Sequence, residues 1–244
     1  MRSINSLPVK LTALMMMVGL VKATGQPVTN TFYCFRELMH VQQVLKDTAH
    51  VSFDAEYVIT FNDATIDTVL YQYKVSGNKV HVTASDSTEF IQNSLYNLLL
   101  QHNRHLAVLY KPVELFKYVL HANLTDPSFH ESLVSGMAVA DTGGYKKLSY
   151  NFKPASPYQQ YDIIYDSTTY RMHAIQYSFN LNGSGAAPSG SKLPFHVTIL
   201  FSNYQTGLFT DSVFSTSAYI TWSKGNCTMA APYAGYQLIN SLNQ

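Results

Sequence analysis

Acidic and histidine side chains occur at a few spacings that can support metal binding. Glu37 and His40 stand one helical turn apart, and His102 and His105 lie together in a polar stretch. A di-metal helix bundle needs two Glu-x-x-His motifs and more helices than this chain offers. The chain also has no His-Glu-x-x-His run and no Cys-x-x-Cys pair. The sequence therefore predicts no metal site and no cofactor. Glu37 and His40 are instead expected to form a surface pair.

Motifs of the common catalytic machineries are missing. Asp162 and Asp166 flank Tyr165, and two carboxylates can share acid–base work. On an alternating strand, however, such residues more often lie on the solvated face. The chain has no Gly-x-Ser-x-Gly elbow, no Walker loop and no dinucleotide-binding Gly-x-Gly-x-x-Gly. We therefore predict that the protein is not an enzyme and has no catalytic residues.

The two cysteines, Cys34 and Cys227, lie near opposite ends of the chain. Export to an oxidising compartment would allow one disulfide between them. The alternative is two free, buried thiols, which behave as small hydrophobic side chains. A bridge requires a specific Cα separation that a sequence does not supply, so both alternatives stay open.

Composition excludes several classes of protein. The 244 residues include 16 Lys+Arg and 15 Asp+Glu, for a formal charge of +1. Charged residues make up 13% of the chain, against roughly 25% in an average soluble protein. Without a cationic excess, we expect no nucleic-acid partner. With 46% hydrophobic residues and little net charge, a disordered chain is also excluded. Neutral polar residues and tyrosine replace the missing charge, which is typical of a β-rich extracytoplasmic protein.

The N-terminus has the pattern of a secretory signal peptide. Arg2 and Lys10 precede an apolar run at residues 11–21, and small residues follow at 23–25. We assign residues 1–25 to a signal peptide and residues 26–244 to a single domain; a buried N-terminal helix is the alternative. No apolar run of about 18 residues follows, so no membrane span is expected in the mature chain. The predicted location is periplasmic or secreted.

Hydrophobic periodicity predicts one helix followed by many strands. Spacing by three and four over residues 29–46 indicates a helix, with Thr29 or Asn30 as its cap. Apolar residues then alternate with polar ones from residue 50 to residue 61, as in a strand with one dry face. Further strands are expected at 69–75, 80–84, 106–110, 148–152, 161–165, 170–181, 195–201 and 214–222, with one bent strand or a pair at 90–100. A helical piece from Pro112, a loop with one more helical stretch at 121–144 and a linker at 182–191 complete the prediction. The fold class is mainly β (α+β), with a large antiparallel sheet.

Aromatic residues fall at alternating strand positions. One interpretation is an apolar pocket with phenolic groups at its mouth. The other is ordinary packing of a β core, since aromatic residues favour strands. The candidate lining residues of a hydrophobic cavity are Phe53, Tyr57, Tyr73, Leu148, Tyr150, Phe152 and Ile163.

The chain resembles a family of periplasmic proteins. In YDIIYDSTTYRMHAIQY (residues 161–177), a strand ending in Tyr165-Asp166 turns through Ser-Thr-Thr into another strand. Residues 73–110 have the predicted order strand, turn, strand, polar turn and strand. This order is similar to the outer-membrane lipoprotein carrier (LolA/LolB-like) family. The resemblance implies a single LolA-like domain, in which a strongly curved, incompletely closed antiparallel sheet has a few helices covering an apolar concave face suited to acyl chains. The loop at 182–191 and the extension at 225–244 depart from the family.

Two functions follow from these observations. The first is an exported, non-catalytic binder of a lipid or acyl-chain ligand, such as a lipid or lipoprotein carrier or sensor, with a lipid or an acylated protein as its partner. The second is a structural or protein-interaction module of the cell envelope, with a filled β core, no ligand and an envelope protein as its partner. A concave-face cavity of about 300 Å³ or more would favour the first.

Overall fold

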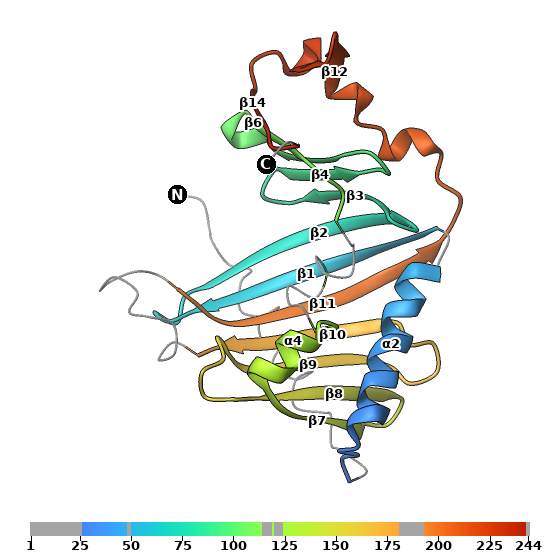
Figure 1. The fold of residues 1–244 in the computed structure, drawn as a ribbon, viewed down its shortest axis with the longest axis vertical. Helices are drawn as coiled ribbons and strands as arrows, with labels where there is room; N and C mark the ends of the chain where they lie inside the picture. Colours follow the sequence, from blue (N-terminus) through green and yellow to red (C-terminus); the bar gives the residue numbers. More distant parts are fainter. Residues whose placement is uncertain (1–25, 48–49, 114–118, 120–123, 181–192, 243–244) are drawn as a thin grey trace, which may run out of the picture.

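The computed structural model describes residues 26–47, 50–113, 119, 124–180 and 193–242. Twelve strands form one sheet, and two α-helices lie in front of one end of it (Figure 1). The helices are α2 (Thr31–Asp47) and α4 (Pro127–Leu133). The strands are β1 (Val51–Phe61), β2 (Ile66–Ser76), β3 (Lys79–Ala84), β4 (Thr88–Gln92), β5 (Asn97–Gln101), β6 (Leu106–Tyr110), β7 (Val134–Asp141), β8 (Tyr145–Phe152), β9 (Tyr158–Asp166), β10 (Met172–Phe179), β11 (Pro194–Thr206), β12 (Ile220–Ser223), β13 (Asn226–Met229) and β14 (Gln237–Asn240). Short 3-10 turns are η1 (His102–Arg104), η2 (Asp211–Phe214), η3 (Thr216–Ala218) and η4 (Ala231–Tyr233).

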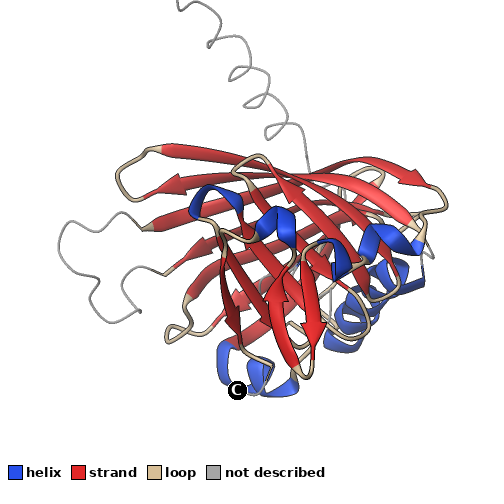
Figure 2. Cartoon of the chain, turned by 90° about the horizontal axis from the view of Figure 1, so that it is seen from above, coloured by secondary structure: helices blue, strands red, loops and turns tan. Residues whose placement is uncertain are grey.

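The sheet consists of two meanders, β1 to β6 and β7 to β11. The first strand of the first meander, β1, pairs with the last strand of the second, β11. The order of the sheet is β14-β6-β5-β4-β3-β2-β1-β11-β10-β9-β8-β7, and β12 and β13 form a separate hairpin. The long strand β1 pairs with β2 on one side and with β11 on the other. The two ends of the order do not meet, and Figure 2 shows the strands as a curved layer. The predicted open, curved, mainly antiparallel sheet is confirmed, except that β14 runs parallel to β6.

The sheet has a core face and an outer face. Phe53 and Tyr73 are paired in register on the core face, and Asp54 and Gln72 are paired on the outer face. Cys34, Leu38 and Val41 of α2 share one buried cluster with Phe53, so α2 covers the core face. Asn30 caps this helix, because its Oδ1 accepts a hydrogen bond of 2.9 Å from the backbone N–H of Tyr33. One of the two predicted caps is thus confirmed.

A β-bulge in β11 changes which face its last residues occupy. Ser202 pairs with Asp54 and Gln205 with Ser52, so β11 contains one extra residue between these pairs. Asn203 adopts a left-handed φ of 55°, which asparagine tolerates better than most residues, and its side-chain amide donates to Asp54 at 2.7 Å. The bulge sends Tyr204 to the core face, where its ring lies 5.3 Å from that of Phe53. Gln205 consequently reaches the outer face.

A second apolar cluster covers the opposite face of β4, β5 and β6. Side chains of these strands pack against residues between Tyr219 and Leu242 of the C-terminal segment. The buried members are Ile91, Leu98, Leu100, Ala107, Leu109 and Ile220. The segment that departs from the resembled family therefore closes one end of the outer face.

Two predicted elements differ from the structure, and in a third region the structure decides between two alternatives. Residues 134–141 form strand β7 rather than a loop, because pairing with β8 compensates for a stretch of small residues with weak alternation. Residues 214–218 lie in 3-10 turns rather than in a strand, and the Ser215 hydroxyl caps one of them by accepting from the Ser217 N–H. Residues 90–100 are the pair β4 and β5, one of the two alternatives.

Some predicted segments lie outside the described residues. These are the signal peptide at 1–25, the linker at 182–191 and most of the helical piece after Pro112. The single domain at 26–244 stays a prediction. Within the part of the chain that the structure describes, no helix is both long enough and apolar enough to span a membrane.

Candidate functional site

The seven predicted cavity residues all belong to one cluster on the core face. Six are buried, and Phe152 is partly buried and packs against the others. The structure brings them together as two groups. Phe53, Tyr57 and Tyr73 lie on β1 and β2, whereas Leu148, Tyr150, Phe152 and Ile163 lie on β8 and β9.

The first group consists of rings in direct contact. Phe53 stacks on Tyr73 with ring centroids 4.8 Å apart and an interplanar angle of 11°. The hydroxyls of Tyr57 and Tyr73 lie 3.5 Å from each other. Burial raises the pKa of Tyr73 to about 12, so the group is neutral at physiological pH. This end of the core face is apolar apart from a few uncharged hydroxyls.

Tyr150 and Phe152 of the second group lie beneath α4. The ring of Tyr150 is 5.8 Å from that of His130 on α4 and 6.0 Å from that of Tyr161. The Tyr150 hydroxyl is buried and has no hydrogen-bond partner among the described residues. An unpaired buried hydroxyl costs about 1–3 kcal/mol of stability, so it calls for an explanation.

A buried ion pair attaches α2 to the sheet. Lys146 Nζ of β8 donates to Glu37 Oε2 at 2.9 Å, and the Tyr165 hydroxyl donates to the same oxygen at 2.8 Å. Burial opposes the ionisation of Glu37, but these two hydrogen bonds outweigh it and hold its pKa below the usual value. The expected surface pair with His40 is therefore wrong for Glu37, whose side chain points into the protein. The helical spacing in the sequence could have shown that Glu37 is buried, since it stands three residues after Cys34 and four before Val41, which are both buried.

A second polar cluster ties the C-terminal segment to the outer face. Glu89 of β4 accepts hydrogen bonds from His81 Nε2 at 2.6 Å, from His102 Nε2 at 2.9 Å and from the Tyr219 hydroxyl at 2.7 Å. The other ring nitrogen of His102 lies 2.8 Å from the Tyr236 hydroxyl. Burial raises the pKa of Glu89, but the three hydrogen bonds overcome it and lower the pKa to about 2. His102 is thus part of a network between two segments rather than only a polar turn.

The two cysteines are free thiols. Cys34 is buried in α2 on the core face, whereas Cys227 lies on β13 beside the cluster on the outer face. The alternative of a disulfide between Cys34 and Cys227 is therefore wrong, because the sheet lies between the two sulfurs. The alternative of two free, buried thiols holds for Cys34, whereas Cys227 is free but only partly buried.

We expect the two thiols to react at different rates with iodoacetamide. Burial raises the pKa of both thiols, so the difference should come from access: the folded protein should be modified at the partly buried Cys227 before the buried Cys34. Peptide mass spectrometry of native and denatured samples measures the two rates. Equal rates in the native sample, or a disulfide between the two cysteines in peptides from the non-reduced protein, would contradict this placement.

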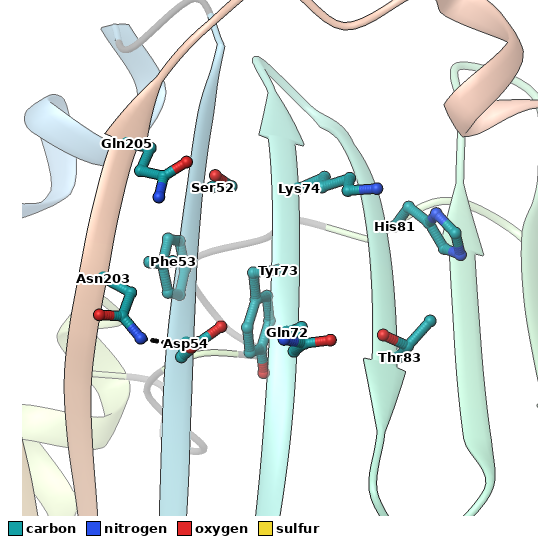
Figure 3. Close-up of a pocket in the computed structure, with 10 residues that line it drawn as sticks. All are labelled: Ser52, Phe53, Asp54, Gln72, Tyr73, Lys74, His81, Thr83, Asn203 and Gln205. Atoms are coloured by element: carbon teal, nitrogen blue, oxygen red, sulfur yellow. Dashed lines mark hydrogen bonds between the residues drawn. The ribbon is translucent and has the colours of Figure 1, made fainter.

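Two hollows formed by the described residues lie on the outer face rather than on the core face. The smaller, about 310 Å³, lies over β11, β1, β2 and β3, and Phe53 and Tyr73 line it together with polar side chains (Figure 3). The larger, about 570 Å³, lies over β8 to β11 and contains Asp162. Asp162 is on the outer face as predicted, but it is buried there. Asp166 instead accepts backbone hydrogen bonds from Thr168 and Thr169 in the turn after β9. Among the described residues, no group of three His, Cys, Asp or Glu side chains is arranged to hold a metal ion.

Comparison with known proteins finds likeness in fold only. No protein family and no curated protein matches the sequence. An uncharacterized conserved protein from Thermus thermophilus is 9% identical, with a TM-score of 0.48, over 85% of this chain and 99% of that one. A LolA superfamily protein from Nitrosomonas europaea is 12% identical, with a TM-score of 0.35, over 77% and 98%. A chain of the Pseudomonas aeruginosa MucA/MucB complex is 11% identical, with a TM-score of 0.38, over 81% of this chain and 63% of that one. A LolA superfamily protein, of the kind that the sequence resembles, is one of these structural neighbours.

Proposed function

We propose that the protein is an exported, non-catalytic binding protein that holds an acyl-chain ligand against its core face, beneath α4. The observation that carries this proposal is the buried Tyr150 hydroxyl without a hydrogen-bond partner among the described residues. A ligand with a carboxyl or ester oxygen would accept that hydrogen bond, and its chain would lie along the aromatic rings. The predicted signal peptide supports a periplasmic location.

The two helices are attached to the core face with unequal strength. Hydrogen bonds from Lys146 and Tyr165 to a buried Glu37 fix α2. Helix α4 has only seven residues, none of them buried, and the rings of His130 and Phe129 make its aromatic contacts. Displacing α4 costs less than displacing α2, and it uncovers Tyr150. We therefore assign α4 as the cover that moves when the ligand enters.

The test combines lipid detection with one substitution. Native mass spectrometry of the protein from its own compartment should reveal a bound lipid, and a dansyl-labelled fatty acid should bind the delipidated protein saturably. Tyr150→Phe should weaken this binding by about five- to tenfold and raise the ligand-free stability by about 1 kcal/mol, since it removes an unpaired hydroxyl.

The matched control is Tyr165→Phe. It removes a hydroxyl that donates to Glu37, so we expect lower stability and unchanged affinity for the fatty acid. The absence of both co-purified lipid and saturable uptake of the probe would overturn the proposal.

One observation favours the second candidate, a cell-envelope interaction module with a filled core. The rings of the candidate residues pack directly on one another, as Phe53 does on Tyr73. If no lipid binds, this packing is the permanent core, and an envelope protein is the partner to seek by crosslinking in the host.

A further inference from the structure

We propose that the larger hollow on the outer face binds a neutral carbohydrate. The side chains that carry the argument alternate with Tyr150 along β8 and so lie on the opposite face of the sheet from the acyl-chain site, although Tyr150 also borders the hollow. Its volume of about 570 Å³ lies within the range of small-molecule sites. The residues that carry the argument come from β8, β9 and β11.

The first observation is a buried carboxylate in the hollow. Asp162 is 2% exposed although it lies on the outer face. Gln160 Nε2 donates to its Oδ2 at 2.6 Å, and Lys147 Nζ lies 3.6 Å from the same oxygen. The other oxygen, Oδ1, accepts no hydrogen bond from the described residues. A buried carboxylate is stable only when its charge is well satisfied, so a ligand hydroxyl that donates to Oδ1 would complete the site.

The second observation is the neutral polar lining. Ser149, Asn151 and Gln159 also line the hollow, and each carries both donor and acceptor capacity. The charges of Asp162 and Lys147 oppose each other, so neither an anionic nor a cationic ligand gains a clear advantage. Adjacent sugar hydroxyls match such a lining, because each hydroxyl both donates and accepts. The low charge of the chain as a whole is consistent with a surface of this kind.

The third observation is an exposed aromatic ring at the edge of the hollow. Phe195 is 41% exposed and stands at the register shift where β11 begins. The negative face of an aromatic ring attracts the weakly positive C–H groups of a pyranose. A ring next to amides and a carboxylate therefore provides both surfaces that a sugar presents.

The position of the hollow disfavours an extended peptide. Strands β8 to β11 lie inside the sheet order, so neighbouring strands already occupy their backbone hydrogen-bonding groups on both sides. Strand addition, the usual way for a sheet to bind a peptide, needs a free edge. Only side chains are available here.

Isothermal titration calorimetry of the full chain with chitotetraose, maltotetraose and cellotetraose tests the proposal. At least one should bind saturably below about 10 mM. Asp162→Asn and Phe195→Ala should each weaken that binding by about tenfold, and Phe195→Ala keeps the test decisive if the buried Asp162 variant fails to fold. Asp54→Asn, in the smaller hollow, is the matched control and should leave binding unchanged.

The contrary results are equally specific. Absence of binding to all three oligosaccharides, binding that survives Phe195→Ala, or saturable binding of inorganic phosphate in their place would each overturn the assignment. Competition by the dansyl-labelled fatty acid would show that the sugar binds elsewhere and would also overturn it. The first three results are independent of whether the core face binds lipid.

Discussion

Replacing Glu37 by alanine should lower the free energy of unfolding by about 3–5 kcal/mol, the largest single effect expected in this protein. The substitution leaves the Lys146 ammonium and the Tyr165 hydroxyl without their shared acceptor. The Lys146 side chain is 19% exposed and cannot be fully hydrated without moving helix α2. Urea unfolding followed by circular dichroism measures the change.

Two further variants show whether the loss arises from the ion pair. Glu56→Ala removes an exposed glutamate of β1 and should change stability by less than about 0.5 kcal/mol. The double variant Glu37→Met, Lys146→Met should recover most of the loss, because an apolar pair of similar volume carries no desolvation cost. A Glu37→Ala effect no larger than that of Glu56→Ala would mean that the pair does not hold α2 in place.

Replacing Glu89 by glutamine should remove about 3 kcal/mol of stability at pH 7 and almost none near pH 2. The pKa of Glu89 is about 2 in the folded protein, below its ordinary value of 4.5. A depressed pKa stabilises the fold fully above pH 4.5, and this stabilisation is lost as the pH falls towards 2. Urea unfolding of both proteins from pH 7 down to pH 2 measures the difference.

The location of this effect is as informative as its size. Glu89 holds Tyr219, so hydrogen exchange in β12, β13 and β14 should accelerate in Glu89→Gln while exchange in β8 and β9 stays unchanged. Glu131→Gln, at an exposed carboxyl of α4, is the control. A stability difference that is the same at pH 7 and at pH 2 would exclude the charge of Glu89 as its source.

Local patterns in the sequence predicted much of the fold. The alternation in residues 51–61 placed Phe53 and Tyr57 on one face of a strand, because successive side chains of a strand point to opposite faces. The three-and-four spacing after Asn30 placed the helix within two residues of its observed start. Strand β7 was missed, because its small residues carry a weak alternation and its pairing with β8 decides its conformation.

The same patterns could not assign the partners of polar residues. Glu89 and Tyr219 are 130 residues apart in the chain, and Glu37 and Lys146 are 109 apart. Such contacts depend on the order and register of all the strands between them. The buried state of Asp162 and the separation of Cys34 from Cys227 depend on the same long-range arrangement.

The sequence by itself determined the low charge, the tyrosine content and the composition, which is that of an exported β protein. It also determined the alternating strands and the helix ahead of them, because periodicity and composition are local properties. Only the tertiary structure decided that the aromatic residues pack as one buried cluster with an unpaired Tyr150 hydroxyl, and that the neutral polar residues gather around two hollows on the other face. The physical reason is that each face is assembled from strands far apart in the chain, so the depth of a hollow and the partner of a buried group exist only once the strands are paired.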